Sequence, residues 1–144
     1  MSHNNIFDPK HAATLDSKER KAWQNPEEIL QLVSITSDTV AADLGCGNGF
    51  FTIPLSRKVK KVYGIDVQNK MLDLLKEKIK AQKITNIETR LSGDKTIPLD
   101  DKQVDLLLTV NTLHEFPDRH KTVKEIHRVI KPNGYAVIVC LLYT

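Results

Sequence analysis

Apolar residues follow two different periods along the chain. Five short apolar runs predict strands at residues 39–44, 61–66, 86–91, 104–110 and 135–143. The segments between them repeat apolar residues every three or four positions, as amphipathic helices do. The first run is apolar on both faces, which is typical of a strand that helices cover on both sides.

Helices are predicted between these strands and ahead of the first one. By residue number, they cover 16–23, 26–33, 50–57, 69–82 and 118–130. The second is expected to have Asn25 as its cap, Pro26 at its first position and Leu32 on its apolar side. The sequence "KPNG" at 131–134 should end the last helix, because proline cannot continue it and Asn-Gly favours a turn.

Strands that alternate with helices imply parallel pairing and right-handed crossovers. We therefore expect an α/β fold with a Rossmann-like, doubly wound, mostly parallel sheet. In such sheets, ligands bind at the carboxyl ends of the strands, near the point where the strand order reverses. Residues 1–36 are expected to form a helical lid and residues 37–144 the ligand-binding core.

The segment "VAADLGCGNGFF" at 40–51 contains three of the six glycines of the chain, Gly45, Gly47 and Gly49. Glycine loses the most backbone freedom on folding, so this cluster indicates an unusual backbone or a close approach. A phosphate-binding P-loop needs a Gly-Lys pair, which the chain lacks. A dinucleotide loop needs its third glycine where Phe50 stands, and a phenylalanine there would obstruct helix packing.

With Asp43 ahead of the loop, "ADLGCGNGFFT" resembles the first motif of the class I S-adenosylmethionine (SAM)-dependent methyltransferases. The resemblance implies that the loop backbone lies against the methionine part of SAM and that Asp43 helps to hold its ammonium end. Asp66 follows Gly45 by 21 residues, close to the ~20 expected for an acid that binds ribose. A carboxylate there can accept hydrogen bonds from both ribose hydroxyls.

Three further segments, "SGDKTIPLDDKQVDLLLT", "VNTLHEF" and "EIHRVIKPNGYAVIV", resemble the same family, so the likeness spans residues 7–140. It implies that Asp94 and the backbone of Lys95 flank the adenine. It also implies that the residues after the fourth strand lie nearest the transferable methyl group. The residues expected at SAM, or at its product S-adenosylhomocysteine (SAH), are Asp43, Gly45, Cys46, Gly47, Asn48, Gly49, Asp66, Val67, Asp94, Lys95 and Asn111.

Several of these residues also allow a structural interpretation. His114 and Glu115 follow the fourth strand, where they would act as a base or orient the acceptor, or else make structural hydrogen bonds in a loop. Cys46 fits a small apolar filler better than a nucleophile. Asp43 and Asp66 would also suit a helix cap or an ion pair in a loop. The five histidines have no ligand-like spacing, so we expect no metal site.

Composition narrows the class of protein. The chain is 40% hydrophobic and 27% charged, as soluble globular proteins are. The basic residues at 57–61 favour a solvated helix end over nucleic-acid binding. No apolar run reaches the ~18–20 residues of a membrane helix, and the N-terminus is too polar for a signal peptide. The two cysteines are too few for a disulfide framework, which suggests a cytoplasmic location.

The resemblance implies a SAM-dependent methyltransferase that acts on a small-molecule acceptor, such as a quinone-like metabolite. Enzymes that methylate the exocyclic nitrogens of bases carry an Asn/Asp-Pro-Pro-aromatic loop after the fourth strand. The residues at 111–114 are Asn-Thr-Leu-His, without the prolines. Two alternatives stay open, a module that binds SAM or SAH without turnover and an NAD-dependent oxidoreductase.

The family sheet has seven strands, and the sequence ends at Thr144, within or just after the fifth predicted strand. We therefore expect the last two strands of the family sheet to be absent. The edge strand 135–143 would then be long, apolar and unpaired, which is an association hazard. A homodimer through this strand is one expected outcome.

Overall fold

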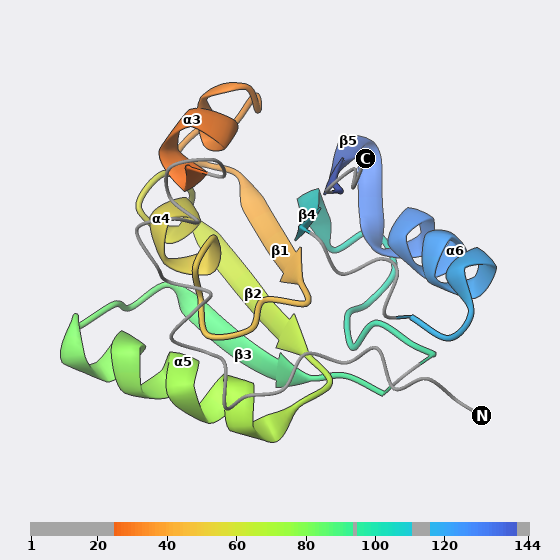
Figure 1. Cartoon of the computed structure of the whole chain (residues 1–144). Helices are drawn as coiled ribbons and strands as arrows, with labels where there is room; N and C mark the ends of the chain where they lie inside the picture. The colour runs from red at the N-terminus through yellow and green to blue at the C-terminus, as the bar shows by residue number, and fades with distance from the viewer. Residues whose placement is uncertain (1–24, 94, 111–115, 141–144) are drawn as a thin grey trace, which may run out of the picture.

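The computed structural model describes residues 25–93, 95–110 and 116–140, so the helix predicted at 16–23 lies outside it. Within these ranges, five strands form one parallel sheet in the order β3-β2-β1-β4-β5 (Figure 1). The order reverses next to β1, as it does in a doubly wound sheet. The predicted Rossmann-like α/β fold is confirmed. The strands are β1 Val40–Leu44, β2 Lys61–Asp66, β3 Ile87–Leu91, β4 Val104–Val110 and β5 Ile130–Val139.

Helices cover both faces of this sheet. The described helices are α3 Pro26–Gln31, α4 Thr52–Ser56, α5 Asn69–Ala81 and α6 Arg119–Val129. Figure 1 shows α4 and α5 on one side of the sheet and α6 on the other. Leu55 of α4 packs against Val62 and Leu106 on the first side, and Ile126 of α6 packs against Leu107 on the second. No helix in the described part of the chain is long and apolar enough to cross a membrane.

The predicted cap of the second helix is confirmed, and α6 also has a side-chain cap. The side chain of Asn25 accepts from the amide of Glu27 at 2.9 Å, and a proline opens α3. Asp118 caps α6 by accepting from Lys121 at 3.1 Å. The prediction that Leu32 faces the core is wrong, because α3 ends one residue earlier and this side chain is 87% exposed.

The helix predicted at 50–57 is shorter in the structure. Its first residues, Phe50 and Phe51, form a buried edge-to-face pair with ring centroids 5.4 Å apart, and α4 begins only after them. Aromatic pairs prefer this geometry. The phenylalanines therefore fill the core on the α4 side of the sheet rather than the first turn of the helix.

Helix α3 lies near the start of β1, away from the carboxyl ends of the strands (Figure 1). Its buried Leu30 packs in the same cluster as Leu55, and Glu27 forms an ion pair with Lys58 at 3.3 Å. The rest of the predicted lid, residues 1–24, lies outside the described residues.

Strand β5 begins at Ile130, five residues before the predicted start at Tyr135. Val104 of β4 pairs with Ile130 and Leu106 with Tyr135, so an advance of two residues on β4 matches five on β5. The extra residues are the "KPNG" segment, in which Asn133 has a φ of 70°. The segment forms an irregularity within the strand pairing rather than a turn ahead of the strand.

Gly134 should not tolerate a side chain. A methyl group at this position would lie 2.6 Å from the backbone oxygen of Asp105, which cannot move without disturbing β4. We expect Gly134→Ala to lower the free energy of unfolding by about 1–3 kcal/mol, the usual cost of overpacking. Urea unfolding measures this change. Gly93→Ala is the matched control, since its nearest heavy atom would be Oγ1 of Thr96 at 3.9 Å. Equal stability of the two variants would contradict the close approach.

Candidate functional site

The glycine loop, residues 45–49, lies at the carboxyl end of β1 and is bonded to the end of β2. The amides of Gly45 and Cys46 both donate to the carbonyl of Ile65, at 2.7 and 3.0 Å. Asp43 and Asp66, at the ends of β1 and β2, are 2% and 8% exposed. The structure therefore brings together the loop and the two acids that the sequence predicts.

Asp66 joins three elements of the fold. Its carboxylate accepts from the amide of Gly47 at 2.9 Å and from that of Gln68 at 2.9 Å. Its backbone carbonyl accepts from the amide of Ser92, just after β3, at 2.9 Å. Burial raises the pKa of Asp66 above its ordinary value, and hydrogen bonds from Gln68, Gly47 and Val67 only partly oppose this. A carboxylate offers about four acceptor positions, so capacity remains for hydroxyl donors.

Asp43 has a partner that the sequence did not suggest. The hydroxyl of Thr52 donates to its carboxylate at 2.7 Å, and both side chains are buried. This bond links the end of β1 to the first residue of α4. Asp43 therefore has a structural role as well, and its contact with a ligand ammonium group stays a prediction.

The backbone of the glycine loop packs closely against a side chain of the protein's own core. Gly45, Gly47 and Gly49 have φ values of 76°, 54° and 96°, which favour glycine. A methyl group on Gly49 would lie 2.6 Å from Cδ1 of Leu75 in α5. One on Gly64 of β2 would lie 3.2 Å from Cδ2 of the same leucine. The sequence gives no signal for this contact, because it joins residues far apart in the chain.

Cys46 and Asn48 point away from solvent, at 6% and 3% exposed. Burial raises the pKa of the Cys46 thiol well above its ordinary value, and the charges of Asp43 and Asp66 raise it further. The thiolate is the reactive form of cysteine. The raised pKa therefore favours the filler interpretation of Cys46 over the nucleophile.

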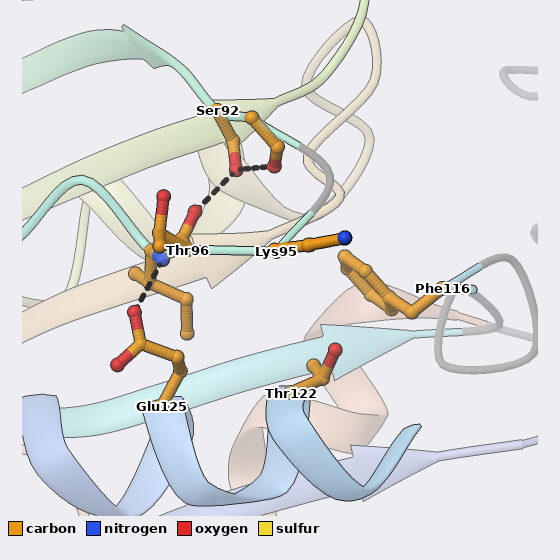
Figure 2. Close-up of a pocket in the computed structure, with 8 residues that line it drawn as sticks. Ser92, Lys95, Thr96, Phe116, Thr122 and Glu125 are labelled. Carbon is orange, nitrogen blue, oxygen red and sulfur yellow. Dashed lines mark hydrogen bonds between the residues drawn. The ribbon is translucent and has the colours of Figure 1, made fainter. Parts of the chain in front are cut away.

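The predicted adenine side of the site has a small pocket. It has a volume of about 190 Å³, part of it open to solvent. The side chains of Lys95 and Phe116 point toward one another across it, and Thr122 and Glu125 approach from α6 (Figure 2). The exposed Lys95 thus lines this pocket, and its contact with adenine stays a prediction. The predicted residues Asp94, Asn111, His114 and Glu115 lie outside the described residues.

A metal centre finds no support in the described ranges. Residues 25–93, 95–110 and 116–140 contain no group of three or more His, Cys, Asp or Glu side chains that could hold a metal ion.

Comparison with known proteins agrees with this geometry. Residues 42–138 match the model of the family described as "Methyltransferase domain". A crystal structure of a SAM-dependent methyltransferase from Aquifex aeolicus is 34% identical, with a TM-score of 0.86, over 92% of this chain and 72% of that one. A putative SAM-dependent methyltransferase from Methanococcus maripaludis, 24% identical with a TM-score of 0.78, covers 96% of this chain and 66% of its own.

Curated relatives include longer proteins. Demethylmenaquinone methyltransferase of Shouchella clausii is 31% identical over 132 residues, which are 90% of this chain and 54% of that protein. The same enzyme of Bacillus mycoides is 29% identical with the same coverage. The chain therefore spans about half the length of these relatives. From the family match and the fold it shares with the Aquifex protein, the chain belongs to the class I SAM-dependent methyltransferase family.

Proposed function

We propose that this chain transfers a methyl group from SAM to a small-molecule acceptor. The observation that carries the proposal is the contact between the glycine loop and Asp66. The loop lies at the carboxyl end of β1, and its Gly47 amide is bonded to a buried carboxylate at the end of β2. In a doubly wound sheet this is the place where a nucleoside ligand binds.

The residues present suit SAM, which supplies a methyl group on a sulfonium and needs no phosphate-binding loop. Asp66 would accept hydrogen bonds from the ribose hydroxyls. The loop backbone and Asp43 would lie at the methionine end, with Asn111 nearby. The half-buried Val67 follows Asp66 directly and would lie with Asp94 and Lys95 at the adenine. These assignments combine the geometry above with the family resemblance.

The acceptor is proposed to be a quinone-like small molecule. Several of the similar proteins bear the name demethylmenaquinone methyltransferase. His114 and Glu115 would orient such an acceptor, and one of them would accept a proton where the acceptor loses one during transfer. Orientation alone can contribute several kcal/mol, with ~7–11 kcal/mol as the limit for ideal cases.

We also propose that the N-terminal segment forms a lid and that the protein is cytoplasmic. The segment ahead of α3 would close over the site and exclude water from the transfer.

The chain contains two cysteines, one buried and one exposed, and both are free thiols. Free thiols are consistent with a reducing compartment.

Calorimetric titration tests the cofactor. We expect SAM and SAH to bind with micromolar affinity and NADH not to bind. Asp66→Ala should weaken SAH binding by at least about ten-fold, since hydrogen bonds to charged groups contribute ~1.5–3 kcal/mol. Asp73→Ala is the matched control, because Asp73 is exposed on α5. Binding of NADH, or equal affinity of the two variants, would contradict the cofactor assignment.

Radiolabelled SAM tests the transfer itself. With demethylmenaquinone as acceptor, the wild-type protein should release labelled product, and His114→Ala should lower the turnover without changing SAH affinity. SAH binding without transfer to any acceptor in a screen would favour the alternative, a binding module without turnover.

The affinity for SAH should depend on pH through Asp66. The pKa of Asp66 is raised in the folded protein, which affects folding and binding differently. Its contribution to folding stability is full below the unfolded pKa and is lost as the pH rises through the folded pKa. Binding has the opposite dependence, because the ribose needs the ionised carboxylate. We expect the affinity to fall about ten-fold per pH unit once the pH is below the pKa of Asp66, which lies above the ~3.9 of an ordinary aspartate. Calorimetry between pH 4 and 8 measures this, and Asp66→Asn should show a weaker dependence on pH than the wild-type protein.

We also propose that two copies of the chain associate through the predicted edge strand 135–143. Within the described ranges, no strand pairs with the outer edge of β5, and Ile138 is 45% exposed there. Light scattering at tens of micromolar should give a dimer, and Ile138→Lys should give a monomer. Val123→Lys is the control, since Val123 is an apolar residue of α6 that is 49% exposed. A wild-type monomer would contradict this association.

A further inference from the structure

The connection between β3 and β4 runs along α6. The structure describes this connection except for residue 94, and its described residues form no helix. Instead, Ile97 and Leu99 are buried at 5% and 6% exposed and pack in the same cluster as Ile126 and Val129 of α6. The position of this connection therefore depends on α6 rather than on a helix of its own.

Arg128 of α6 binds the connection through its whole guanidinium. It donates to the backbone oxygens of Ile97 and Leu99, both at 2.9 Å, and to the carboxylate of Asp101 at 2.8 Å. Two further bonds, at 2.5 and 3.2 Å, go to the carboxylate of Glu125 one turn earlier. The five N–H groups of a guanidinium have a fixed planar geometry. Their partners are therefore held in one arrangement.

Glu125 provides a second hydrogen-bond partner for the backbone of Ile97. Its Oε1 accepts from the amide of Ile97 at 3.0 Å, and its side chain is 14% exposed. The hydrogen bond from Arg128 is the main reason that the pKa of Glu125 lies below its ordinary value. Both backbone groups of Ile97 are thus bonded to α6, the amide by Glu125 and the carbonyl by Arg128.

The other end of the same segment is bonded to the candidate site. The amide of Ser92 donates to the backbone carbonyl of Asp66 at 2.9 Å. Its hydroxyl donates to the carbonyl of Thr96 at 2.9 Å (Figure 2). Lys95 therefore lies between a residue bonded to Asp66 and a residue bonded to α6. Helix α6 and the end of β2 together fix where the backbone of Lys95 can lie.

We infer that Arg128 and Glu125 are positioning residues that hold the backbone of Lys95 against the adenine of the cofactor and so set the preference of the site for adenine. The inference rests on the proposed function, in which the backbone of Lys95 flanks the adenine. If the amide of Lys95 is held in place, it can donate a hydrogen bond to N1 of adenine, because N1 is an acceptor. In hypoxanthine N1 carries a proton, and two donors would face each other, which leaves both unpaired.

The preference for SAH over S-inosylhomocysteine is the readout, since a loss of global stability alone would not change it. Calorimetric titration should show that the wild-type protein binds SAH at least about ten-fold more tightly than the inosine analogue. Arg128→Met should weaken SAH binding by about ten-fold and bring the preference close to one. Arg119→Met is the matched control, because Arg119 is exposed on the first turn of the same helix.

Arg128→Lys provides a second variant that keeps the charge and should fold where Arg128→Met fails. A lysine cannot make all five hydrogen bonds, so the preference of this variant for SAH should be intermediate between wild type and Arg128→Met. An unchanged preference in a folded Arg128 variant would overturn the inference, and so would a wild-type protein that binds both ligands equally. Failure of the wild-type protein to bind SAH at all would instead overturn the proposed function on which the inference rests.

Discussion

The buried carboxylate of Asp66 is the group on which the rest of the site depends. A charge that is removed from water is costly unless hydrogen bonds compensate it. Here the compensation comes from the amides of Gly47 and Gln68, so the carboxylate fixes the glycine loop relative to β2. The neighbouring backbone carbonyl fixes Ser92 and the start of the next connection. The site is thus organised around the same group that is proposed to bind ribose.

Much of the fold follows from local pattern. The sequence predicts β2 and β4 to the residue, because each is a mostly apolar run with polar residues at its ends or next to them. It places the start of β5 five residues late, because Pro and Asn-Gly are turn signals in isolation. In the folded chain, the positive φ of Asn133 and the close approach of Gly134 to Asp105 admit those residues into the strand. That is a tertiary effect, which no local pattern contains.

In the candidate site too, some residues could be predicted from the sequence and others could not. Asp43 and Asp66 could be predicted, because an acid at the end of a buried strand is conspicuous in the sequence. Thr52 could not, because its hydroxyl matters only once α4 brings it within 2.7 Å of Asp43. Arg128 was equally hidden. A basic residue near the end of a helix is ordinarily a solvated group near the helix dipole. Only the arrangement of α6 beside the β3–β4 connection gives Arg128 its three hydrogen bonds to that connection.

The contact of Leu75 with two glycines has a consequence for how such a chain can evolve. A side chain at Gly49 would lie 2.6 Å from this leucine, and one at Gly64 would lie 3.2 Å from it, so the end of the leucine side chain would have to move for either. Substitutions at these three positions are therefore epistatic, and their order matters. A shorter residue at position 75 would ease the contact at Gly64, at the expense of a cavity. Gly49 would stay restricted even then, because its φ of 96° is strained for any other residue, although neither glycine need ever touch a ligand.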